Sequence, residues 1–296
     1  MSIITAVQGA LSLLTLWFAA VFFSHANKNK DKMSDASWGT LSVVGFITNF
    51  FDTLGIGSFA PTTALFRAFK LVPDRLIPGT LNVSMTIPVV FEALIFMTVI
   101  QVDPFTLIAL VAAAIVGAVF GAGVVSHLPE KKIRIGMGVA LIIVAFTFVA
   151  GLLKWMPIGG EAIALNGAAL AIGVVGNLIF GALMTIGVGL YAPCMAMVYA
   201  LGMSPKVAFP IMMASCAFLM PAASMKFVKE FAYDIKASIA VTIGGSIGVF
   251  IAAYIVKELP LDILKWVVVV VCIYTGITLL RAGLKSPDTK PVVEKA

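Results

Sequence analysis

The sequence predicts an all-α polytopic membrane protein. Three observations carry this prediction: an apolar composition, helix-length apolar stretches along the whole chain, and a glycine-proline element that occurs twice. Of the 296 residues, 61% are hydrophobic and only 11% are charged. A soluble fold has too little polar surface to cover so large an apolar core, so we expect a lipid bilayer to surround the chain.

Seven uninterrupted apolar stretches have about the 20 residues that a helix needs to cross a hydrocarbon layer of about 30 Å. The first, Ile3 to Phe23, has no basic start and no clear small-residue cleavage site, so we expect a retained helix rather than a signal peptide. The other six occupy residues 77–99, 105–125, 133–153, 207–225, 235–256 and 261–280.

Two further apolar stretches, 40–71 and 163–201, contain glycine and proline runs that an unbroken helix does not tolerate. The run GIGSFAP begins at Gly55 and the run GVGLYAP begins at Gly187, 132 positions later. The correspondence continues outside the two runs, at a spacing of 131 or 132, in the pairs Pro73/Pro205, Pro78/Pro210, Asp103/Asp234 and Gly117/Gly248. This register indicates an internal duplication.

The duplication divides the chain into four parts. We expect an N-terminal transmembrane helix and cytoplasmic loop over 1–36, a first repeat over 37–156, a second repeat over 157–284 and a cytoplasmic tail over 285–296. Each repeat then consists of one broken segment followed by three transmembrane helices.

The charges of the loops favour inverted repeats. If the broken segments are re-entrant hairpins, the two repeats have opposite orientations, and 16 of the 20 Lys and Arg residues collect on one side of the membrane. If the segments cross instead, the basic residues divide almost evenly. Because Lys and Arg stay preferentially in cytoplasmic loops, we expect the inverted arrangement with the C-terminus in the cytoplasm. The opposite side then holds Lys154, Lys206, Lys257 and Lys265.

A hairpin that ends inside the bilayer leaves backbone N–H and C=O groups unpaired, which is tolerated only beside protein or a water-filled cavity. A helix that begins near Pro61 or Pro193 also presents free N–H groups and a positive dipole end, which suit an anion. The glycines of the two turns let a solute approach the backbone closely. The candidate solute-binding residues are Asn49, Thr53, Gly55, Gly57, Ser58, Pro61, Thr62, Asn177, Thr185, Gly187, Gly189, Tyr191 and Pro193. The alternative for each single hydroxyl or amide is helix packing.

Asp52 and Glu92 lie deepest in apolar sequence, where an ionised side chain costs at least about 2.5 kcal/mol. One interpretation is that these carboxyl groups couple transport to H⁺ or Na⁺. The other is that they are neutral or paired with a nearby Lys or Arg. Both interpretations remain open at this level.

The duplicated glycine-proline element, the proline-containing return helix and the small size resemble the TauE/SafE sulfite exporter family. The similarity covers both repeats. The resemblance implies a permease of the bacterial inner membrane that moves sulfite or an organosulfonate, usually in the export direction. Our mechanistic hypothesis is alternating access, in which the two hairpins meet near the midplane and hold the anion between their helix N-termini. Ser58 and Leu190 follow the GxG runs, where family members commonly carry a denser run of glycines.

Other classes of protein find less support. We expect no enzyme: the run GGSIG at Gly244 fits a serine-hydrolase pattern, but His25 and His127 lie at predicted helix ends, far from Ser246. Three cysteines in apolar segments predict neither a disulfide framework nor a metal site. We expect no cofactor and no nucleic-acid partner. An anion channel or a membrane-embedded structural subunit remains the alternative function, and the oligomeric state is open.

Overall fold

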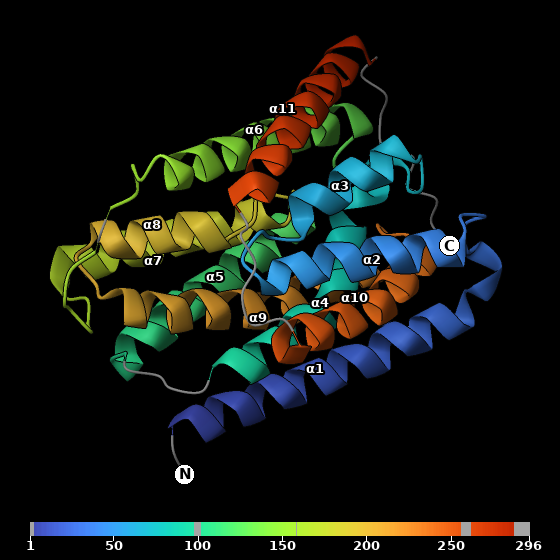
Figure 1. Ribbon diagram of the computed structural model, residues 1–296. Coiled ribbons are helices and arrows are strands. Elements are labelled where there is room, and N and C mark those ends of the chain that lie inside the picture. The colour runs from blue at the N-terminus through green and yellow to red at the C-terminus, as the bar shows by residue number, and fades with distance from the viewer. Residues whose placement is uncertain (1–2, 98–101, 158, 256–261, 287–296) are drawn as a thin grey trace.

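The structure is a computed structural model that describes residues 3–97, 102–157, 159–255 and 262–286. Every regular element within these ranges is a helix (Figure 1). Two of them are short 3-10 helices, η1 (Lys30–Lys32) and η2 (Asp74–Leu76). The α-helices are α1 (Ile3–Lys28), α2 (Trp38–Thr53), α3 (Phe59–Ala68), α4 (Ile77–Phe96), α5 (Pro104–Val125), α6 (Glu130–Leu152), α7 (Gly167–Met184), α8 (Tyr191–Ala200), α9 (Pro205–Lys229), α10 (Ile235–Ile255) and α11 (Asp262–Lys285). The predicted tail 285–296 lies almost entirely outside the described residues.

Helix length separates the helices that are long enough to cross a membrane from the shorter ones. Within the described residues, eight helices are long and apolar enough to cross a bilayer, namely α1, α4, α5, α6, α7, α9, α10 and α11. The remaining α-helices are α2 with 16 residues and α3 and α8 with 10 residues each. At about 1.5 Å per residue, even α2 covers only about 24 Å. The prediction of an all-α polytopic membrane protein is confirmed.

The short helices belong to two hairpins. α2 and α3 form the first hairpin, and α7 and α8 form the second; they enter the bundle from opposite ends and turn back near its middle (Figure 1). The first tip comprises residues 54–58 and the second tip residues 185–190. Gly55 and Gly187 adopt φ values of +93° and +108°, which residues with a Cβ rarely reach, so these glycines permit the reversals.

The first helix of each hairpin packs against the other half of the chain. α2 lies along α10, and α7 lies along α5. Glycines allow this close approach: a Cβ at Gly45 would stand 2.6 Å from the backbone of Val241, and one at Gly181 would overlap the carbonyl oxygen of Ala114. Small residues that let backbones touch are a common means of helix association in lipid. Each half therefore holds the hairpin of the other half.

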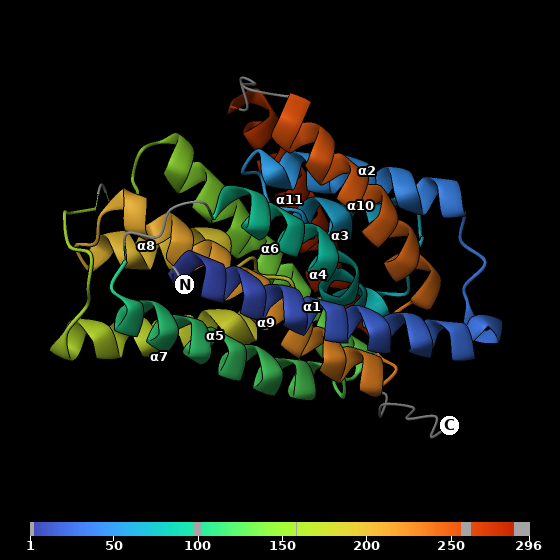
Figure 2. The ribbon, with the colours of Figure 1, turned by 90° about the horizontal axis from the view of Figure 1, so that it is seen from below.

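Further contacts pair corresponding helices of the two halves. α6 packs against α11, α4 packs against α9, and α1 lies across α9 and α4 on the outside of the bundle (Figure 2). Exchanging the two halves thus exchanges α2·α10 with α5·α7 and maps α4·α9 and α6·α11 onto themselves.

Hydrogen bonds identify the loops that share each end of the bundle. At one end, Arg134 at the start of α6 binds both Asp74, which follows α3, and Ser286, which follows α11. We call this the basic end. At the other end, Asp103 and Leu165 connect the loop between α6 and α7 to the start of α5, through Asp103 N to Ile163 O and Leu165 N to Thr106 Oγ1. We call this the opposite end.

Candidate functional site

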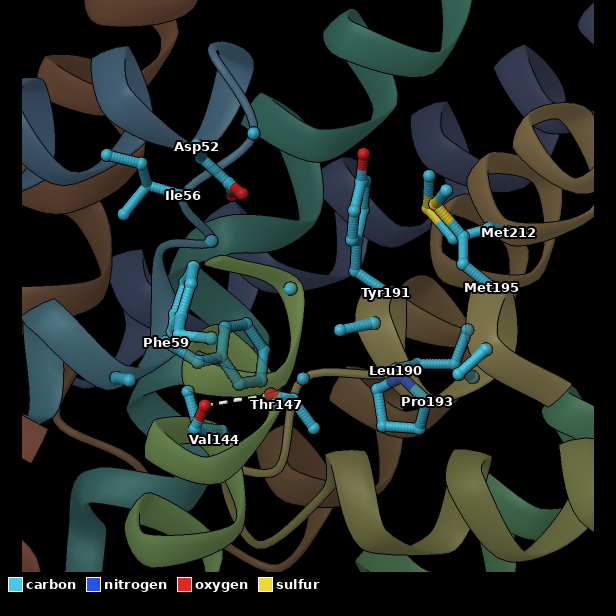
Figure 3. A pocket seen from close by; sticks show the side chains of 18 of the residues that line it. Asp52, Ile56, Phe59, Val144, Thr147, Leu190, Tyr191, Pro193, Met195 and Met212 are labelled. Carbon is cyan, nitrogen blue, oxygen red and sulfur yellow. Dashed lines mark hydrogen bonds between the residues drawn. The ribbon is translucent and has the colours of Figure 1, made fainter. Parts of the chain in front are cut away.

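A cavity of about 420 Å³ lies where the two hairpin tips meet. The first tip contributes Ile56 and Ser58, and the second contributes Gly189 and Leu190. Figure 3 shows Asp52, Ile56 and Phe59 on one side of this space, with Leu190, Tyr191 and Pro193 facing them. The sequence correspondence alone predicted that both interruptions turn back at a common depth. The cavity is the structural counterpart of that correspondence.

The cavity reaches the opposite end of the bundle. Lys154, Met156, Asp262 and Lys265, at the end of α6 and the start of α11, belong to its lining. Lys265 Nζ lies 3.5 Å from Asp262 Oδ1, and the Asp262 side chain is 83% exposed. Solvent at the opposite end therefore has access to the cavity. Within the described residues, Lys154 and Lys265 are also the basic side chains of its lining.

A carboxylate lies next to the first tip. Asp52, in the last turn of α2, accepts a hydrogen bond of 2.5 Å from Ser58 Oγ. Ser58 directly precedes α3, so this carboxylate lies beside the N-terminus of that helix. An anion at a helix N-terminus is stabilised by the free N–H groups and by the helix dipole.

A second carboxylate lies beside the first. Glu92, on α4, is only 6% exposed, lines the cavity and accepts a hydrogen bond of 2.8 Å from Thr53 Oγ1. Within the described ranges, neither Glu92 nor Asp52 forms an ion pair with a Lys or Arg side chain. The pairing with Lys or Arg that the sequence left open for these two acids is therefore not found among the described residues, and their hydrogen-bond partners are hydroxyl groups.

The second tip has no such carboxylate. The residue that corresponds to Asp52 at the spacing of 132 is Met184, which also lines the cavity. α8 begins at Tyr191, and Pro193 follows as its third residue, so the first turn of α8 presents backbone N–H groups toward the cavity without a capping side chain. The two tips share a backbone design and differ in charge.

The predicted site residues divide into two groups. Gly55, Gly57, Ser58, Gly189, Tyr191 and Pro193 line the cavity, together with Asp52 and Glu92. The residues outside its lining are Asn49, Thr53, Pro61, Thr62, Asn177, Thr185 and Gly187.

Two of the residues outside the lining, Asn49 and Asn177, have amide side chains that contact neighbouring helices. Asn177 Nδ2 donates to Leu110 O on α5 (2.8 Å) and to Ser215 Oγ on α9 (2.9 Å). The amide of Asn49 lies against Gly245 of α10, since a Cβ there would stand 2.5 Å from Asn49 Nδ2. These contacts are what the packing alternative expects. The amide oxygens of Asn49 and Asn177 and the hydroxyl oxygen of Thr62 are buried without a hydrogen-bond partner among the described residues.

Sequence reasoning missed the wall that α6 and α9 contribute. Val144 and Thr147 on α6 face the tips, with Thr147 Oγ1 donating to Val144 O at 2.8 Å (Figure 3). Met212, Met213 and Cys216 on α9 form another part of the lining. Apolar residues of an apolar helix carry no sequence signal that separates a cavity wall from lipid-facing or core positions.

The serine-hydrolase pattern belongs to a helix contact. Ser246 Oγ donates to Thr242 O one turn earlier in α10, at 2.7 Å. A Cβ at Gly244 would overlap the carbonyl oxygen of Ser42 on α2, and one at Gly248 would overlap that of Phe46. The small residues of GGSIG therefore serve the close packing of α2 on α10.

Comparison with known protein families decides the class. The family model described as "Sulfite exporter TauE/SafE" matches residues 2–148 and 169–295. The chain belongs to the sulfite exporter TauE/SafE family. The matched residues include the first hairpin, all but the first two residues of the second hairpin, and both tips. No curated protein and no solved structure matches the chain.

Membership of the TauE/SafE family relates the cavity to solute transport. The family consists of membrane transporters of sulfite or sulfonate type, and the eight long apolar helices of the described residues agree with a multi-pass transporter. A TauE/SafE protein needs a solute pathway, and within the described residues the cavity between the tips is the space that both repeats build together.

Proposed function

We propose that this protein carries a small anion, sulfite or an organosulfonate, across the bacterial inner membrane, and that the anion binds between the two hairpin tips. The observation that supports this proposal most strongly is the shared cavity, to which each repeat contributes a tip and a helix N-terminus. Paired broken helices at the bilayer midplane are the usual location of a transporter site.

The charge distribution orients the cavity. The basic end carries most of the Lys and Arg residues, so it and the C-terminus are cytoplasmic by the positive-inside rule. The cavity extends to the other end. In this orientation the structure is open toward the outside and closed toward the cytoplasm.

An ion-pair network accounts for the closed basic end. Asp74 binds Arg67 of α3 through one oxygen (3.1 Å) and Arg134 of α6 through the other (2.8 Å). Arg134 also binds Glu130 at 2.7 Å, and Arg67 Nη1 donates to Thr278 of α11 at 3.0 Å. The network ties the first hairpin to α6 and α11. Alternating access requires these contacts to separate when the cavity opens to the cytoplasm.

We further propose that Asp52 and Glu92 couple anion movement to H⁺ or Na⁺. Both carboxyl groups line the cavity, and Thr53, the residue next to Asp52, donates a hydrogen bond to Glu92. A carboxyl group that lines the substrate site and has no basic partner is suited to bind a cation from solution, H⁺ or Na⁺, and to release it again.

Transport into proteoliposomes tests the proposal. We expect saturable movement of ³⁵S-sulfite or of a labelled sulfonate, stimulated by a pH or sodium gradient. The variant Gly189→Leu, which places a large side chain in the cavity, is expected to abolish flux, whereas Gly9→Leu on α1, where a Cβ also meets nothing within 4 Å, is the matched control. Flux that rises linearly with concentration and survives in Gly189→Leu vesicles contradicts the proposal.

A further inference from the structure

The two tips differ in the groups that they present to an anion in the cavity. At the first tip, the carboxylate of Asp52 lies beside the N-terminus of α3, where it accepts a hydrogen bond from Ser58 Oγ. At the second tip, Met184 takes the corresponding place and leaves the N-terminus of α8 uncapped. A solute anion that lies between the tips therefore meets free N–H groups on one side and a resident anion on the other.

We propose that Asp52 competes with the transported anion for the Ser58 hydroxyl group. The anion accepts the hydrogen bond from Ser58 only after the carboxyl group of Asp52 has released it and has bound a proton. This inference rests on the proposed anion transport and adds the residue and the mechanism of coupling. The proton comes from water in the cavity and forms an O–H bond on the displaced carboxyl group. One proton therefore enters the site with each anion.

The surroundings of Asp52 support a change of charge there. The ionisable groups close enough to interact electrostatically with Asp52 are Glu92 on α4, Tyr191 on α8 and Cys216 on α9. Lys154 and Lys265 stand at the mouth of the cavity rather than at the tip. No neighbouring cation among the described residues holds Asp52 ionised, and Glu92 opposes a second negative charge. A solute anion adds to this opposition.

The test measures proton uptake during anion binding. The probes are ethanesulfonate, and sulfate as an inorganic analogue of sulfite, because both remain fully ionised between pH 5 and 8 and any pH dependence then belongs to the protein. Calorimetry of the purified full chain in two buffers of different ionisation enthalpy gives the affinity and the number of protons bound. For the wild-type protein we expect about one proton per anion, and an affinity that falls about tenfold per pH unit where Asp52 is ionised.

Two variants complete the test. Asp52→Asn retains an acceptor for Ser58 and removes the charge, so we expect anion binding without proton uptake and with a flat pH profile. Glu92→Gln removes the neighbouring charge and is expected to shift the pH range while retaining the uptake of one proton. Wild-type binding without proton uptake, or uptake that persists in Asp52→Asn, overturns the competition. Failure of wild-type protein to bind either probe at any pH overturns the proposed anion site itself.

Discussion

Arg134 Nε lies 2.8 Å from Asp74 Oδ2, and this contact joins the start of α6 to the turn that leaves the first hairpin. The Asp74 side chain is 13% exposed and serves two arginines at once. The basic end of the transporter is thereby closed by a shared carboxylate rather than by apolar packing alone, and an arrangement of this kind can separate into water.

Asp74→Ala leaves both arginines without their common partner. We expect the variant to lose about 1 to 3 kcal/mol of stability, between the values for exposed and buried ion pairs, because the groups are partly buried. We also expect a cysteine placed near Thr278 to become more reactive toward a thiol reagent from the cytoplasmic side. Thermal unfolding and labelling rates measure the two effects. Arg75→Ala, at the adjacent position, is the control and should change neither.

Gly45→Ala tests the exchange of hairpins between halves. The added methyl group stands 2.6 Å from the Val241 backbone, so α2 and α10 must move apart, at a cost of about 1 to 3 kcal/mol. Gly39→Ala in the same helix is the matched control, since its nearest neighbour is 3.9 Å away and the gain in helix propensity is the same. Equal melting temperatures for the two variants would contradict the packing described here.

Gly187→Ala and Gly189→Ala form a second matched pair. Neither position has a neighbour within 4 Å of an added Cβ, but only Gly187 has a positive φ, of +108°. We expect Gly187→Ala to cost about 1 to 2 kcal/mol through backbone strain at the second tip and to reduce flux, whereas Gly189→Ala leaves the melting temperature nearly unchanged. Unfolding in detergent separates the two. Comparable losses in both variants would mean that the strain lies elsewhere.

Thr147→Cys tests the wall that α6 provides. Thr147 lines the cavity, and its hydroxyl bonds only to Val144 O among the described residues, so a cysteine fits without breaking a contact between helices. In a background without the three native cysteines, we expect labelling from outside the cell and protection by substrate. Ile172→Cys, on the exposed face of α7, is the control that substrate should not protect. Labelling of Thr147→Cys that substrate does not slow separates α6 from the solute pathway.

The tips and their meeting could be predicted because the physics is local: Gly55 and Gly187 mark backbone that a helix cannot contain, and their fixed spacing marks a duplication. The partners of polar groups could not. Asn177 and Glu92 are both polar residues in apolar sequence, yet the first connects α7 to α5 and α9 while the second faces the cavity. That distinction depends on helix rotation. The exchange of hairpins between halves likewise depends on long-range packing, which a pattern within one segment does not encode.

A crystal of the protein grown with 2-bromoethanesulfonate would test the central claim most directly, through the anomalous signal of bromine. We expect a bromine peak in the cavity, with the sulfonate within hydrogen-bond distance of the backbone N–H groups in the first turn of α8. A peak on the lipid-facing surface, or an occupied site bordered by only one of the two tips, would contradict it.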